Sequence, residues 1–144
     1  MKLTEKELDR LRRIADELQL DGRELLFSHD LEYINAHCNG IGPAHWASGI
    51  RAVISKLHKS ATLAAMIHDL WWDSVTDTEK AALLGAFNES NNAFERNALK
   101  LADYHYGWYN PLRYLARNEA RKFHGLLDMF GYRNFLEAVA KNSH

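Results

Sequence analysis

The sequence has too few cysteines for a disulfide framework and no apolar segment long enough to cross a membrane. Cys38 is the only cysteine in 144 residues, so no internal disulfide can form. Asp69 and Asp73 interrupt the longest apolar candidate, which falls short of the ~20 residues that a bilayer requires. The amino terminus, MKLTEKELDRLRR, is charged where a signal peptide would be apolar. We therefore expect a soluble, cytoplasmic protein without a transmembrane segment.

The sequence also lacks an excess of charge of either sign. Lys and Arg together number 18 and Asp and Glu 19, which gives a formal net charge of -1 and leaves no long basic or acidic run. Charge therefore gives no indication of nucleic acid or of an anionic membrane surface as a partner. A chain of 144 residues with 47% hydrophobic content is suited to one domain, residues 1–144, with a single core.

Helical periodicity and capping signals cover most of the chain, and no segment has the pattern of a strand. Thr4 and Glu7 have capping-box spacing, as do Thr76 and Glu79, and Asn110-Pro111 is a typical cap followed by the first turn of a helix. Ser60 could cap the central helix. The sequence predicts a compact all-α fold of roughly six helices, without a sheet. The expected helical segments are 4–21, 23–37, 44–59, 62–72, 76–103, 111–130 and a last short one at 133–141.

Two further features of the sequence predict which side chains face solvent, the core or a partner. The polar run between Asn88 and Arg96 is typical of a solvated helix face, but would be the wall of a site if it faced His68. The aromatic connector YHYGWY, residues 104–109, is expected to be held against the core. Trp71, Trp108 and Tyr109 could alternatively form a contact surface for a protein partner.

The segment ATLAAMIHDLWW, residues 61–72, places His68 and Asp69 on a helix that is apolar nearly all round. Such a helix is normally buried, and burying an ionisable side chain costs several kcal/mol unless it finds a partner or a metal. One interpretation is structural, with both side chains bonded to neighbouring backbone or to basic residues. The other is a general base beside a metal-binding carboxylate, separated by about 100° around the helix.

The segment CNGIGP, residues 38–43, interrupts the helical pattern. Gly40 and Gly42 permit backbone angles that are forbidden to other residues, and Pro43 cannot continue a hydrogen-bond ladder. The segment is either a plain turn or a loop whose carbonyl oxygens converge, which suits a hard cation such as calcium.

Together, the C-x-G-x-G loop and the helical His-Asp pair resemble the phospholipase A family of small, helical, calcium-dependent enzymes, including its phage-associated relatives. The resemblance covers about a third of the chain. It implies an ester substrate, with His68 as the base that activates water. It also implies that a second residue, from the next long helix, orients the histidine, and here Asn92 or Asp103 is expected in that role. The implied calcium ligands are the carbonyls of Cys38, Gly40 and Gly42 and the carboxylate of Asp69.

Two further interpretations remain open. The segment LAAMIHDL is similar to the His-Asp helix of the HD family of metal-dependent phosphohydrolases, which implies a divalent metal and a phosphoester substrate. The outer ligands would then be an upstream histidine and a downstream aspartate, from the candidates His29, His37, His45, Asp103 and Asp128. In the other interpretation the chain is a non-catalytic helical module that binds or inhibits a protein, and the His-Asp pair is structural.

Overall fold

The computed structural model describes residues 2–38 and 59–142, and every regular element in these two ranges is helical. This confirms the predicted all-α fold. In chain order the elements are α1 (Glu5–Glu17), α2 (Glu24–Ser28), α3 (Leu31–His37), the 3-10 turn η1 (Lys59–Ala61), α5 (Thr62–Ser74), α6 (Lys80–His105), α7 (Pro111–Phe130) and α8 (Tyr132–Asn142). The expected loop 39–43 and most of the expected helix 44–59 lie outside the described residues.

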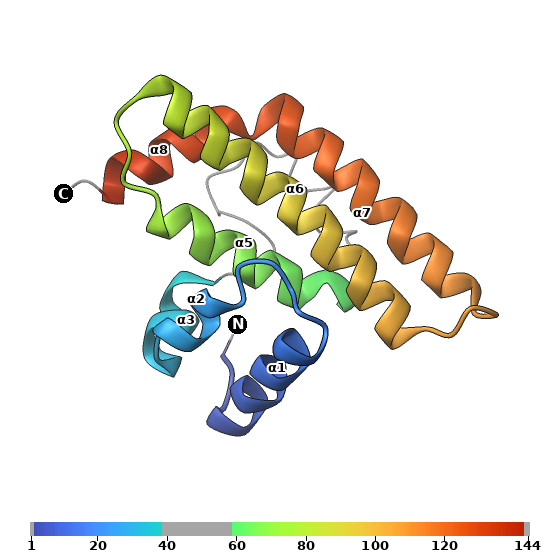
Figure 1. Ribbon diagram of the computed structural model, residues 1–144. Coiled ribbons are helices and arrows are strands. Elements are labelled where there is room, and N and C mark those ends of the chain that lie inside the picture. Colours follow the sequence, from blue (N-terminus) through green and yellow to red (C-terminus); the bar gives the residue numbers. More distant parts are fainter. Residues whose placement is uncertain (1, 39–58, 143–144) are drawn as a thin grey trace.

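Helix α5 lies at the centre of the described fold. It packs against α2 and α3 on one side and against α6 and α8 on the other, as Figure 1 shows. Because its side chains are apolar nearly all round, it buries residues on every face, as the sequence predicts. The carboxyl end of α5 is held by α8, where the Asn142 side-chain amide donates to the backbone oxygens of Trp72 and Val75, each at 2.9 Å.

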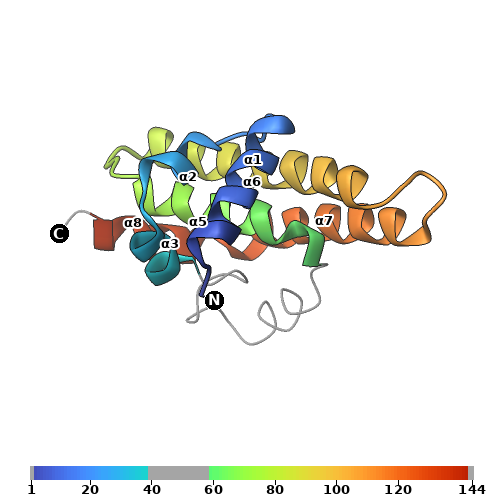
Figure 2. The same cartoon turned by 90° about the horizontal axis from the view of Figure 1, so that it is seen from below.

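Helices α6 and α7 form a long antiparallel hairpin, and they run side by side in both views (Figures 1 and 2). The Asn110 side chain accepts a hydrogen bond from the Leu112 amide, and Pro111 follows in the first turn, as predicted. The predicted end of α7 at Gly131 is also confirmed. The loop at the tip of the hairpin projects beyond the other described helices (Figure 1).

Several predicted boundaries are wrong. The segment 23–37 is two helices, because His29 is extended and the Asp30 side chain accepts from the Tyr33 amide and so begins a new helix. Thr76 and Glu79 form no capping box, because residues 75–79 reverse the chain and α6 begins only at Lys80. The N-cap of α5 is Ala61, not Ser60.

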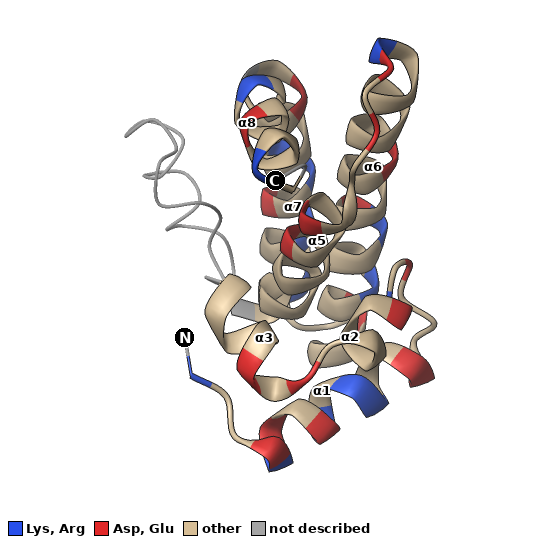
Figure 3. Ribbon diagram, turned by 90° about the vertical axis from the view of Figure 1, so that its left-hand side faces the viewer, with Lys and Arg blue, Asp and Glu red and all other residues tan. Residues whose placement is uncertain are grey.

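The connector at 104–109 also differs from expectation. Trp108 and Tyr109 are 74% and 76% exposed, so these aromatic rings are not held against the core. Both residues belong to the loop between α6 and α7, and this loop projects beyond the other described helices (Figure 2). Charged residues of both signs are interspersed over the outer helices, as the balanced composition predicts (Figure 3). No described helix has a stretch apolar and long enough to span a bilayer.

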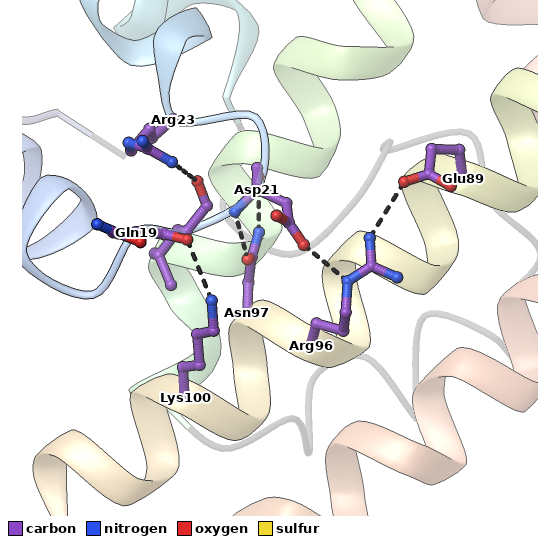
Figure 4. A network of polar contacts seen from close by, with 8 residues as sticks. Gln19, Asp21, Arg23, Glu89, Arg96, Asn97 and Lys100 are labelled. Carbon is purple, nitrogen blue, oxygen red and sulfur yellow. Dashed lines mark hydrogen bonds and ion pairs between the residues drawn. The ribbon is translucent and has the colours of Figure 1, made fainter.

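The turn between α1 and α2 is fastened to α6 by a polar network (Figure 4). The buried Asn97 side chain accepts from the Asp21 amide at 2.8 Å and donates to the Asp21 carbonyl at 2.9 Å. Arg96 pairs with the Asp21 carboxylate at 2.7 Å, and Lys100 donates to the Gln19 carbonyl. Gly22 has a φ of +84°, and a Cβ atom there would lie 2.8 Å from the Ile67 side chain, so glycine is required in this turn.

Removing the Asn97 amide should therefore destabilise the protein. We expect Asn97→Ala to lower the free energy of unfolding by about 2 to 3 kcal/mol, because two backbone groups of Asp21 lose their partners in a partly buried place. Urea denaturation followed by circular dichroism measures this loss. Asn92→Ala is the matched control, because Asn92 is exposed on the same helix and its removal should change stability by no more than about 0.5 kcal/mol. If the two substitutions lower the free energy of unfolding equally, the Asn97 hydrogen bonds do not stabilise the turn.

Candidate functional site

His68 lies on the buried side of α5, with 5% of its surface exposed. The Trp72 ring, one turn further along the helix, lies 4.6 Å from the imidazole between centroids, and the Phe94 ring of α6 meets it edge-on at 5.9 Å. Burial disfavours the charged imidazolium and lowers the pKa of His68 to about 4, although the hydrogen bond to Asn91 acts in the opposite direction. His68 is therefore neutral at neutral pH.

A second residue, Asn91 of α6, binds the imidazole. His68 Nε2 lies 2.9 Å from Asn91 Oδ1, and Asn91 Nδ2 donates to Asp128 Oδ1 of α7 at 3.1 Å. A carboxylate only accepts hydrogen bonds, so Asp128 fixes which end of the Asn91 amide faces the histidine. The amide oxygen that faces His68 must then accept, and Nε2 must carry the proton. In the neutral imidazole this leaves the lone pair on Nδ1.

The two residues expected to orient His68 lie elsewhere. Asn92 is exposed on α6 and is not the partner of the imidazole, since the adjacent Asn91 makes that contact. Asp103 is also on the surface, where Arg113 and Arg117 of α7 each bind it at 2.8 Å. The sequence did carry a signal for the correct residue. Asn91 stands four positions after Phe87 and three before Phe94, both buried, so helical periodicity places it on the core face of α6.

Of the implied calcium ligands, the structure describes Cys38 and Asp69. Asp69 is partly exposed on α5, and it lies close enough to Cys38 for its charge to act on the thiol. Burial first, and then the Asp69 and Asp73 carboxylates, raise the pKa of the Cys38 thiol. The thiol therefore stays protonated and lies against the Met66 carbonyl at 3.7 Å. Cys38 could hold a cation through its carbonyl oxygen but not through a thiolate. Gly40 and Gly42 lie outside the described residues.

The candidate ligands of a phosphohydrolase site are dispersed. His29 and His37 stack on the two faces of Tyr33, with ring centroids 4.1 and 3.9 Å apart, and lie near Asp73. Burial raises the pKa of the Asp73 carboxyl, while these histidines and the Tyr33 hydroxyl oppose the shift. Asp103 and Asp128 are placed as above, and His45 is not among the described residues. Within residues 2–38 and 59–142, no group of three or more His, Cys, Asp or Glu side chains could hold a metal ion.

Comparison with known proteins adds no identification, since no family, curated protein or solved structure matches the chain. The site must therefore be interpreted from its own geometry.

The buried histidine should make stability depend on pH. Its pKa is 6.5 when unfolded and about 4 when folded, so between these values the unfolded chain binds the extra proton. The stability that neutral His68 contributes is fully present above about pH 6.5 and is lost as the pH falls towards 4. Between pH 7 and pH 5 the loss in unfolding free energy is about 2 kcal/mol. Urea denaturation of wild type and His68→Gln at both pH values measures it. The difference in unfolding free energy between the two proteins should shrink at the lower pH, and the pairwise comparison removes the contribution of Asp73. If the difference in unfolding free energy is the same at both pH values, burial does not lower the pKa of His68.

Proposed function

We propose that this protein is a calcium-dependent ester hydrolase of the phospholipase A type, with His68 as its general base. The observation that carries the proposal is the contact between His68 and Asn91. A histidine on one buried helix is held through Nε2 by a residue of the next long helix, so that the basic lone pair lies on Nδ1. The relation between the two helices is the one that the resemblance implies.

The chemistry assigned to His68 is proton transfer. Nδ1 takes a proton from a water molecule as its oxygen bonds to the carbonyl carbon of the ester. When the tetrahedral intermediate collapses, the bond to the alcohol oxygen breaks and the imidazolium returns the proton to that oxygen. The products are a carboxylic acid and an alcohol. Asn91 holds the ring in one orientation through both transfers, and the rings of Trp72 and Phe94 pack against the imidazole.

The metal assigned to this site is calcium. Asp69 fits the assignment in part, because it is a partly exposed carboxylate close to Cys38. The Asp69 carboxylate and the carbonyls of Cys38, Gly40 and Gly42 would hold the ion. When bound, calcium would supply positive charge for the oxyanion of the intermediate.

The hydrolase proposal predicts a histidine-dependent release of fatty acid. Wild-type protein should hydrolyse phospholipid in mixed micelles with calcium present and stop when EDTA is added. His68→Gln should lower the initial rate about 100-fold or more, because removal of a general base costs factors of this size. His105→Gln, at an exposed histidine near the hairpin tip, is the control and should leave the rate unchanged. Hydrolysis that His68→Gln leaves intact would exclude His68 as the base.

A second candidate function is supported by two observations. His68 is enclosed by aromatic rings, as a purely structural histidine would be, and the exposed Trp108 and Tyr109 are residue types that dominate protein interfaces. On this alternative the chain is a non-catalytic module that binds a protein through the tip of the α6–α7 hairpin.

Calcium distinguishes the two candidates in a thermal-shift titration. For the hydrolase, calcium at 100 times its dissociation constant should stabilise the wild type by about 2.7 kcal/mol, and Asp69→Asn should remove this effect. Magnesium is the control for a general effect of divalent salt. A binding module should respond to neither ion, and a response that survives Asp69→Asn would place any cation elsewhere.

A further inference from the structure

The contact between Asn91 and Asp128 belongs to a larger arrangement of polar side chains. Asn91 and Glu95 stand four residues apart on α6, and His124 and Asp128 stand four residues apart on α7. His124 lies between two carboxylates, with Nδ1 2.8 Å from Glu95 Oε2 and Nε2 3.3 Å from Asp128 Oδ2. The contacts therefore run from His68 through Asn91, Asp128 and His124 to Glu95, across two antiparallel helices.

The chemistry of each group determines how the arrangement acts on the histidine. An amide such as that of Asn91 can present either its oxygen or its nitrogen, so by itself it does not select a tautomer of the imidazole. Asp128 removes this ambiguity because its carboxylate accepts only, and the Asn91 amide nitrogen donates to it at 3.1 Å. Asn91 is fully buried, whereas the Asp128 side chain is 46% exposed. The carboxylate thus stays partly solvated, and its link to the buried ring is the hydrogen-bonded Asn91 amide.

We propose that Asp128 is a positioning residue for His68, acting through the Asn91 amide to hold the imidazole in the tautomer protonated on Nε2. The role in catalysis rests on the proposed function, but the effect on the tautomer does not. Asn91 itself carries no charge. The negative charge of Asp128 lies one hydrogen bond beyond it.

The test is the tautomer of His68, read from the ¹⁵N chemical shifts of the imidazole in labelled protein. Wild type should show the form protonated on Nε2. In Asp128→Asn, residue 128 can donate as well as accept, the Asn91 amide can turn over, and the form protonated on Nδ1 should appear. Asp103→Asn is the matched control, since it removes one carboxylate from the surface of α6 without contacting Asn91. A wild-type spectrum from Asp128→Asn would overturn the proposal.

A second variant covers the case in which Asp128→Asn fails to fold. Exchanging the two residues, Asn91→Asp together with Asp128→Asn, keeps one carboxylate and one amide between the helices. The carboxylate now accepts from His68 directly, so the form protonated on Nε2 should be restored and the fold recovered. If the exchanged protein shows the tautomer protonated on Nδ1, the positioning role is wrong.

Activity distinguishes failure of this inference from failure of the proposed function. If the enzyme hydrolyses phospholipid, Asp128→Asn should lower kcat about 10-fold and leave KM unchanged, because the substrate does not contact Asp128. If wild type hydrolyses nothing but the tautomer changes in Asp128→Asn, the positioning role stands and the hydrolase proposal falls. If hydrolysis proceeds and neither kcat nor tautomer responds, the hydrolase proposal stands and the inference falls.

Discussion

The structure depends on a single requirement, that an imidazole buried on an apolar helix be given a partner. His68 cannot ionise there at neutral pH, and an unpartnered ring would cost the fold as much as a lost hydrogen bond or more. Asn91 meets this need, but as a buried amide it needs a partner in turn, and Asp128 supplies it. The relative positions of α5, α6 and α7 are thus tied together by polar contacts as well as by apolar packing.

Much of the fold could be predicted from the sequence because local signals and buried surface agree. The apolar residues of α5, the N-cap Thr4 that accepts from the Glu7 amide, and the Asn110-Pro111 start of α7 each act within a few residues of chain. Prediction failed where a polar side chain had two uses. Asp30 could have continued a helix but begins a new one, and Thr76 could have capped a helix but lies where the chain reverses. Such choices depend on tertiary packing.

The candidate site was predictable only in part. The His-Asp pair could be found from its cost of burial, but the partner of the histidine lies one position from the residue expected, and this moves it about 100° around the helix. Periodicity with Phe87 and Phe94 would have selected Asn91. The link to Asp128 spans 37 residues and depends on how α6 and α7 pack, so no local pattern could have given it.

The fastening of the α1–α2 turn by Asn97 has a consequence at a distance. α2 and α3 follow that turn directly, and Cys38 follows α3 and contacts the Met66 carbonyl of α5. The separation of Cys38 from Asp69 is therefore determined partly by an amide on a third helix that contacts neither residue. Substitution of Asn97 would therefore alter the geometry of the cation site proposed above without replacing any of its proposed ligands.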